Sequence, residues 1–386
     1  MIELDKSLKQ IQSAAREFAK GEFDKDTILD MEKAGLFPRD TWREAADLGF
    51  IGLHLDEEFG GGGLGLLESL ITLEALCRRD SSCGLALGLA ASGAELIQIL
   101  GNEAQKKAVL EPVCEGRALC GAALFEPGQG YDPTSCETQA RLEGDEWVIT
   151  GKKIQVANGA VDGDIPIFFP LLCRTENGLS LILVDHQTPG LALTPTPRKL
   201  GNNLCPTADM FLDQARVPAA NLLGKEGKAL KAVNGYLDQV KYLNAGMALG
   251  IAQGSLDRAL AYGKQREQFG RPVLVFEGLS RYVGEMALNI KGSRSLVYDA
   301  ALVADTQRKP EPGLADMAME SACRTAESAA DASLQIHGGF GYMQEGEIEH
   351  FYRDAKYLKL LGSHPHSRLS TLAKLTVGKI KTPKRA

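Results

Sequence analysis

The chain has 386 residues, of which 44% are hydrophobic and 24% charged, and its formal net charge is −7. This length and composition predict a soluble globular protein with a large core, and the absence of a long basic stripe argues against a nucleic-acid-binding role. No stretch of about 18 apolar residues could span a bilayer, and the charged N-terminal segment does not resemble a secretion signal, so we expect a cytoplasmic protein without a membrane anchor. The eight cysteines include no CxxC pair, which argues for free thiols in a reducing compartment and against a zinc or other metal site.

The first part of the chain, residues 1–119, is predicted to be helical. Apolar residues recur at helical spacing within 8–18 and again within 67–76. Between these stretches lies the glycine-rich segment 57–65, which lacks the Lys-Ser/Thr end of a phosphate-binding P-loop. We therefore interpret this segment as a connection.

Residues 120–228 have the pattern of a small β domain. Strands are predicted over 137–142 and 146–150, with Gly144-Asp145 as the hairpin turn between them. Further strands are predicted over 179–184 and 210–212, and prolines interrupt the remaining segments.

Helical spacing returns over residues 229–386. The segment 230–265 contains no proline, further helical stretches run through 276–306 and 314–337, and a last one follows Ser367. Long antiparallel helices of this kind indicate a bundle.

Five local motifs carry more specific information than this order of elements. Together they resemble segments of the acyl-CoA dehydrogenase superfamily, in the family's order and spacing. The segments are 124–132 (LFEPGQGYD), 217–224 (VPAANLLG), 266–272 (REQFGRP), 335–342 (QIHGGFGY) and 353–356 (RDAK).

The resemblance implies a mostly α fold with a β insert: an N-terminal helical domain, a middle β-barrel-like domain and a C-terminal four-helix bundle. It also implies a homotetramer or homodimer that binds FAD across a subunit interface. Arg266 would offer its guanidinium to the pyrophosphate, and Gly338 and Gly339 would let the backbone approach the cofactor. His337 is interpreted as a structural neighbour of the cofactor. The cofactor-binding residues implied are Leu124, Phe125, Tyr131, Gln155, Ala157, Arg266, Gln268, Phe269, Gln335, Gly338 and Gly339.

The chain departs from the family at the catalytic base. Members use a glutamate to remove a proton next to the thioester carbonyl. Most place it six residues after RDAK, where this chain has Gly362, and a minority place it at the start of the first bundle helix, where this chain has Val240. Neither side chain can accept a proton.

The residues expected around the flavin ring are changed as well. Phe125 and Tyr131 replace a threonine and a serine of the family pattern, while Gln155 and Ala157 replace the first and last residues of its Trp-Ile-Thr triplet. The motifs for the adenosine and pyrophosphate persist, so we expect bound FAD with altered reactivity.

Other groups would then have to transfer the proton. The candidates are His364, His366 and Tyr131, although the two histidines could simply belong to an exposed loop. Asp238 and Lys241 occupy positions at which family members contact substrate, but a helix-surface ion pair explains them equally well.

The leading hypothesis is therefore an FAD-dependent oxidoreductase that acts at the α,β carbons of an acyl-CoA or acyl-carrier-protein thioester, with a relocated acid or base. A reductase fits the loss of glutamate because it needs a proton donor rather than a strong base. The alternatives are a non-catalytic, FAD-supporting subunit of a heteromeric dehydrogenase, a flavin monooxygenase, and a non-redox thioester eliminase. An electron-transfer flavoprotein is a further expected partner.

Overall fold

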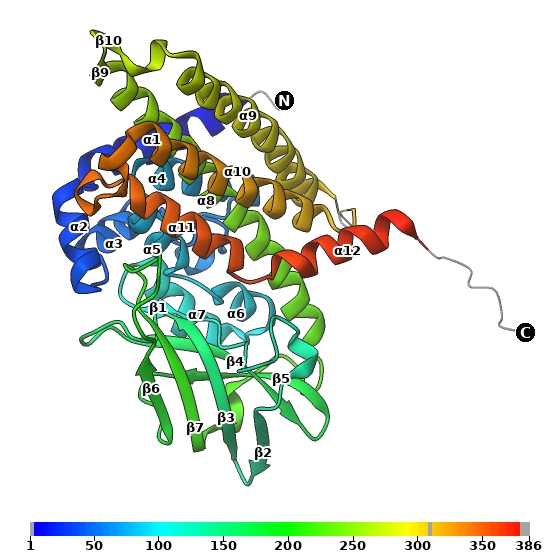
Figure 1. Ribbon diagram of the computed structural model, residues 1–386. Coiled ribbons are helices and arrows are strands. Elements are labelled where there is room, and N and C mark those ends of the chain that lie inside the picture. Colours follow the sequence, from blue (N-terminus) through cyan, green and yellow to red (C-terminus); the bar gives the residue numbers. More distant parts are fainter. Residues whose placement is uncertain (1–3, 308–310, 379–386) are drawn as a thin grey trace, which may run out of the picture.

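The computed structural model describes residues 4–307 and 311–378, and its elements fall into three successive groups (Figure 1). The N-terminal helices are α1 (Lys6–Glu22), α2 (Lys25–Ala34), α3 (Arg39–Asp47), α4 (Leu66–Arg79), α5 (Ser81–Leu89), α6 (Ala94–Leu100) and α7 (Glu103–Cys114). The strands that follow are β1 (Leu119–Cys120), β2 (Gln139–Glu143), β3 (Glu146–Ala157), β4 (Ile167–Thr175), β5 (Gly178–Asp185), β6 (Leu191–Pro195), β7 (Thr207–Pro218) and β8 (Leu222–Leu223). The C-terminal elements are α8 (Leu230–Gln265), β9 (Glu267–Gln268), β10 (Arg271–Pro272), α9 (Glu277–Thr306), α10 (Leu314–His337), α11 (Ile348–Leu360) and α12 (Pro365–Val377). This order confirms the predicted fold class, a mostly α protein with a β insert.

The N-terminal helices bury apolar stripes at the predicted spacing. In α1, Leu8, Ala15 and Phe18 are buried, and the Asp5 carboxylate caps the helix by accepting from the Leu8 N–H at 2.8 Å. The glycine-rich segment folds back on the chain before it, since the Gly63 N–H donates to the Leu55 carbonyl at 2.8 Å. The structure thus places a packed connection between η1 (Glu57–Phe59) and α4.

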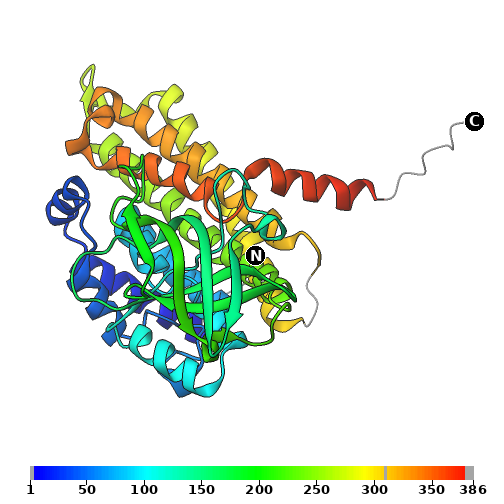
Figure 2. The same ribbon diagram turned by 90° about the horizontal axis from the view of Figure 1, so that it is seen from below.

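The strands of the middle domain form one sheet in the order β6-β7-β3-β2-β4-β5-β8, with β1 paired to β4. Figure 2 shows these strands side by side, in green. The hairpin turn falls at residues 144–145 as predicted, and Gly144 has the positive φ of 62° that this turn requires. Strands β4 and β6 are absent from the sequence prediction. Pro170 lies inside β4 and Pro195 ends β6, and prolines at these points read as interruptions.

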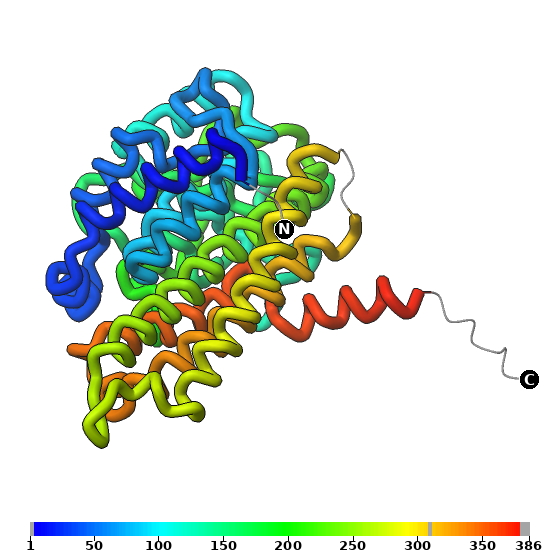
Figure 3. Tube along the Cα trace, turned by 90° about the horizontal axis from the view of Figure 1, so that it is seen from above, coloured from blue at the N-terminus to red at the C-terminus, as the bar shows by residue number. Residues whose placement is uncertain are grey.

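Four C-terminal helices, α8 to α11, pack side by side as a bundle (Figure 3). The 36-residue helix α8 is the central element, because α10 packs along it on one side and α4 of the N-terminal domain on another. Its contact face carries the small residues Gly246, Gly250 and Gly254, at which an added Cβ would meet the backbone of α4. Helix α12 extends away from the body of the molecule (Figures 1 and 3).

A buried carboxylate on α11 ties the three groups of elements together. Asp354, the aspartate of the RDAK segment, is fully buried and accepts hydrogen bonds from the Ser81 and Ser82 hydroxyls at 2.7 and 2.8 Å. It also accepts from the Asn202 N–H of the β domain at 2.6 Å. These bonds satisfy a carboxylate that would be costly to bury unpaired, and they fix α11 relative to α5 and the sheet.

Candidate active site

A cavity of about 500 Å³ lies where the β-domain loops meet α5, α8 and the turn after α11. Cavities that hold small-molecule ligands have volumes of this order and walls that are mostly apolar. The apolar lining includes Leu89, Leu124, Ile154, Leu237, Val240, Leu243, Met247, Leu360 and Leu361.

One wall of the cavity comes from the loop and strand residues expected to surround a flavin ring. Leu124, Phe125 and Tyr131 line it, and so do Gln155 and Ala157. The pairing of β3 with β7 shifts register between Lys153 and Val156, and Gln155 has a φ of 51°. This irregularity turns the end of β3 so that its residues face the cavity.

A buried ion pair holds the loop that carries Phe125 and Tyr131. Lys153 is fully buried, and its ammonium lies 2.6 Å from the Glu126 carboxylate. Burial alone would raise the pKa of Glu126, but hydrogen bonds from Lys153 and Thr138 outweigh it and hold that pKa at about 2. The other carboxylate oxygen accepts from the Glu137 N–H at 2.7 Å, so the loop is fixed at both ends.

Gly362 and Val240, the two positions at which the resemblance predicts a glutamate, lie next to each other in this cavity. A Cβ added at Gly362 would lie 3.3 Å from Val240 Cγ1 and 3.9 Å from Asn244 Nδ2. Gly362 follows α11 and Val240 lies on α8, yet both line the same space. The part of the cavity that a glutamate from either position would reach therefore contains a glycine and a valine.

Tyr131 is the candidate proton-transfer residue that the structure places in the cavity. Its ring packs edge-on against Phe125, with 4.7 Å between ring centroids. Burial raises the pKa of Tyr131, and the nearby Arg368 opposes this rise. Tyr131 and Gly362 line the same cavity, so the Tyr131 hydroxyl is the candidate proton donor or acceptor inside it.

The other two proton-transfer candidates lie elsewhere. His364 and His366 are exposed and are not among the residues that line the cavity. His364 is the N-cap of α12, and its Nδ1 accepts from the His366 N–H at 3.1 Å. This geometry gives His364 a local structural role.

Asp238 and Lys241 form an ion pair on the helix, which is one of the two interpretations that the sequence allowed. The Lys241 ammonium lies 2.9 Å from Asp238 and 3.0 Å from Asp316, and neither Asp238 nor Lys241 lines the cavity. Burial lowers the pKa of Lys241, but the two carboxylates outweigh it, so the pKa is raised.

The remaining positions that the resemblance predicts to bind the cofactor lie at the opposite end of the bundle. The hairpin β9–β10 stands at the end of α8 remote from the β domain (Figure 1). The predicted positions there and after α10 are all exposed: Arg266, Gln268, Phe269, Gln335, Gly338 and Gly339. An added Cβ at Gly338 or Gly339 would meet open space, so this backbone is accessible. The structure thus separates the predicted cofactor residues into a cavity set and a distal set within one chain.

His337, next to the distal set, is packed rather than open. Its Nδ1 lies 2.7 Å from the Ser333 carbonyl, and its ring stacks on Tyr262 with a centroid distance of 4.4 Å. Burial lowers its pKa. These contacts agree with a structural role for this histidine.

Three family models together match most of the chain. They are the N-terminal, middle and C-terminal domains of acyl-CoA dehydrogenase, which match residues 5–117, 121–215 and 229–363. The chain belongs to the acyl-CoA dehydrogenase family. Members of this family are FAD-binding oxidoreductases, and the arrangement above is their three-domain fold.

Individual relatives agree over nearly the full length. The probable acyl-CoA dehydrogenase YngJ of Bacillus subtilis is 34% identical over 93% of this chain and 95% of that protein. The acryloyl-CoA reductase (NADH) of Anaerotignum propionicum is 32% identical over 92% of this chain and 91% of that protein. The structure of butyryl-CoA dehydrogenase from Megasphaera elsdenii superposes with a TM-score of 0.89 at 28% identity, covering 98% of this chain and all of that one.

The residues of this acyl-CoA dehydrogenase family member fit an FAD. The cavity offers an apolar wall at Phe125 and Ala157, together with an open loop at Gly128 and Gly130, where an added Cβ meets nothing within 4 Å. The distal set offers the exposed guanidinium of Arg266, which forms no ion pair within residues 4–307 and 311–378. A planar ring and a pyrophosphate are the groups that such surfaces accept.

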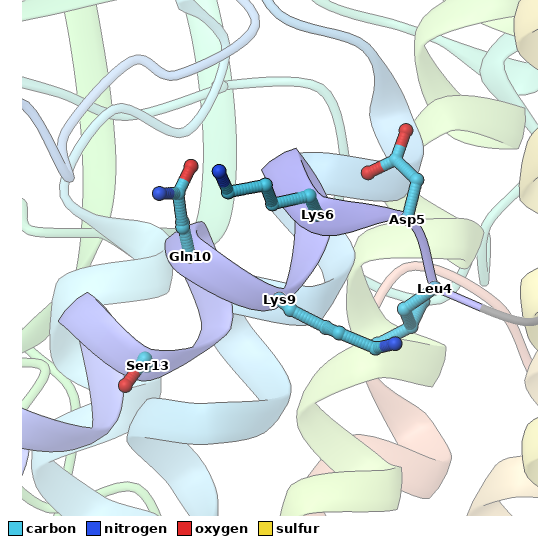
Figure 4. Close-up of a pocket in the computed structure, with 6 residues that line it drawn as sticks. All are labelled: Leu4, Asp5, Lys6, Lys9, Gln10 and Ser13. Atoms are coloured by element: carbon cyan, nitrogen blue, oxygen red, sulfur yellow. The ribbon is translucent and has the colours of Figure 1, made fainter.

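A second hollow lies on the outer face of α1 (Figure 4). Side chains from the start of this one helix line it, among them Lys6, Lys9 and Gln10, and most of them are exposed. Its position, remote from the motifs, leaves the interior cavity as the candidate active site.

Within the described ranges no group of three or more metal-ligating side chains occurs, and no described helix is long and apolar enough to cross a membrane.

Several polar residues of the cavity wall were missed by the sequence analysis. Ser92, Glu95 and Tyr236 line it, as does Lys199, whose pKa is lowered by burial. None of them belongs to a recognised motif, and only the packing of α5, α6 and α8 brings the first three together.

Proposed function

We propose that this chain is an FAD-dependent reductase of α,β-unsaturated acyl thioesters. The observation that carries the proposal is the facing pair Gly362 and Val240, which leaves no carboxylate at either position of the family base. Dehydrogenation needs a base that removes a weakly acidic proton, whereas reduction needs a donor that supplies one. Among the curated relatives are an acryloyl-CoA reductase and a 3-(aryl)acrylate reductase, which supports this direction.

The proposed proton donor to the α carbon is Tyr131. Its raised pKa keeps the hydroxyl protonated at neutral pH, and its side chain lines the cavity, as Gly362 does. Bound FAD would supply the hydride for the β carbon when reduced. The apolar walls at Leu237 and Leu361 would exclude water from the reacting atoms.

We further propose that the working form is a homo-oligomer, a dimer or a tetramer. A single chain cannot bring the distal set to its own cavity, because α8 separates the two along its length (Figure 1). The distal end also exposes large apolar side chains, with Phe269 at 91% and Tyr342 at 89% exposure. A second copy would cover them and place its Arg266 beside the first copy's cofactor.

Electrons would reach the protein from an electron-transferring flavoprotein, and the acyl group would be presented by coenzyme A or a carrier protein.

A cytoplasmic location agrees with eight cysteines that are all buried free thiols. The named relatives are dehydrogenases and reductases. Their names therefore support none of the three alternatives, which are a supporting subunit, a monooxygenase and an eliminase.

The test is an anaerobic spectroscopic experiment on the purified protein. We expect the photoreduced protein to be reoxidised rapidly by an enoyl thioester such as crotonyl-CoA, and the oxidised protein to bleach slowly with butyryl-CoA. Tyr131→Phe should slow reoxidation by roughly 10²-fold or more. The matched control is Tyr282→Phe, on the partly exposed surface of α9. Rapid bleaching by butyryl-CoA would overturn the reductive direction, and indifference to every thioester would overturn the function.

A further inference from the structure

The cavity has a polar corner that the proposed reaction does not use. It is formed by Ser92 and Glu95, from the α5–α6 region, and by Tyr236 of α8. The Ser92 hydroxyl lies 3.2 Å from the Tyr236 hydroxyl. Glu95 and Tyr236 are only 6% and 3% exposed, so the corner lies deep in the molecule.

Glu95 is oriented by two partners behind it. One carboxylate oxygen lies 2.9 Å from His54 Nε2, and the other accepts from the Gly93 N–H at 3.1 Å. A carboxylate has about four acceptor sites, so these two contacts leave acceptor capacity free. Because Glu95 also lines the cavity, that capacity is available to a ligand.

The corner is close to the reaction site. Tyr236 and Val240 are four residues apart on α8, which places their Cβ atoms about 6 Å apart on one face of the helix. A thioester whose α and β carbons lie beside Val240 and Gly362 would therefore place a more distal part of its acyl chain near the corner.

A plain alkyl chain matches this corner poorly. A buried carboxylate that loses water without gaining a donor is destabilised, and the same holds for the two hydroxyls. The burial of Tyr236 raises its pKa well above its usual value, and the Glu95 carboxylate adds to the rise, so this hydroxyl remains a neutral donor and acceptor. The corner is rich in acceptors, and within the described residues its ionisable partner is His54.

We propose that the acyl group carries a hydrogen-bond donor, a hydroxyl or an ammonium, on a carbon several bonds beyond the reacting pair. The donor binds Glu95, and Ser92 and Tyr236 complete its surroundings. This inference rests on the proposed function and specifies its substrate class.

The test measures binding, so it does not require turnover. Isothermal titration calorimetry compares matched coenzyme A thioesters of about four to six carbons that end in a methyl, a hydroxyl or an ammonium group. We expect at least one donor-bearing thioester to bind about tenfold or more tightly than its alkyl counterpart, because a hydrogen bond to a charged group contributes that much. The hydroxyl and ammonium series show which donor the corner takes.

Two variants locate the preference. Glu95→Gln keeps the shape and removes the charge, and Tyr236→Phe removes one hydroxyl. We expect Glu95→Gln to reduce the preference to about twofold or less while binding of the alkyl thioester changes little. Glu115→Gln, at the exposed end of α7, is the control and should leave the preference intact.

The outcomes distinguish this inference from the proposed function. If alkyl thioesters bind as tightly as their donor-bearing counterparts, the polar corner holds water and the inference is wrong, while the reductase proposal stands. Should Glu95→Gln abolish reaction with every thioester equally without changing their relative binding, Glu95 would be an acid or base and the inference would again fail. Absence of binding by all thioesters would overturn both.

Discussion

The cavity and the distal end of the bundle have changed to different extents relative to the family pattern. Around the cavity, Phe125, Tyr131, Gln155 and Ala157 all differ from the predicted family pattern, and Gly362 stands where that pattern has a glutamate. At the distal end, the segments 266–272 and 335–342 keep the family residues and remain on the surface. Under the proposed function, this contrast separates the distal residues, which would hold the cofactor of a second copy, from the cavity residues, which would surround the reacting atoms.

The largest expected effect comes from placing a carboxylate at one of the two predicted positions of the family's base. In Val240→Glu, the new side chain would emerge from α8 toward Gly362, where apolar walls would raise its pKa and make it a competent base. We expect bleaching of the oxidised flavin by saturated acyl thioesters to accelerate by roughly 10²- to 10⁴-fold. Stopped-flow absorbance under anaerobic conditions measures this rate.

Val240→Gln is the matched control, because it has the same size and cannot take up the proton. If the flavin of the glutamate variant bleaches no faster than that of the glutamine variant, the absence of a carboxylate at residue 240 does not limit dehydrogenation. The sequence differences around the cavity would then not account for the proposed reaction direction.

A second prediction concerns α11, the helix that runs between the two regions. On it, His350 is buried 3.1 Å from Asp80. Burial lowers the pKa of His350, but Asp80, Asp354 and Glu32 outweigh it and raise the pKa to about 9. Because the pKa is higher in the folded than in the unfolded state, the stabilisation is fully present below about pH 6.5 and is lost as the pH rises through about 9.

The expected loss is about 3 kcal/mol, measured as the free energy of unfolding in urea between pH 6.5 and 9.5. His350→Gln should be less stable at pH 6.5 and should show a flatter dependence on pH. An unchanged slope in this variant would assign the pH dependence to other groups.

The third prediction tests the distal end alone. Arg266→Ala removes an exposed guanidinium that we assign to the cofactor of a second copy, so the FAD dissociation constant should rise by about 10- to 100-fold with no change in circular dichroism. Arg281→Ala, an exposed arginine that pairs with Glu285 on α9, is the control. Equal FAD retention in both variants would show that the distal set does not hold the cofactor.

The sequence predicted much of the fold because its signals are local. The uninterrupted spacing over 230–265 reproduces α8 to the residue, and Gly144-Asp145 marks the observed hairpin. Strand β4 forms a local hairpin with β5 through residues 176–177, but it was not predicted because Pro170 inside it is typical of an interruption. Motif comparison likewise singled out Gly362 and Val240, whereas the residues around Glu95 come from two loops and α8, which no local pattern connects.

The smallest expected effect is that of a substitution at Gly362. It also shows why the new glutamate is placed at Val240 rather than at Gly362. Gly362 has a φ of 72°, a left-handed conformation that disfavours any side chain, and an added Cβ would lie within 3.4 Å of Val240. Gly362→Ala should therefore destabilise the protein by about 1 kcal/mol, measured by urea unfolding. Gly292→Ala, in the interior of α9 with open space around it, should instead stabilise by about 0.5–1 kcal/mol. If both substitutions stabilise the protein, the turn after α11 adapts freely, and a glutamate at residue 362 would be as suitable a replacement as one at residue 240.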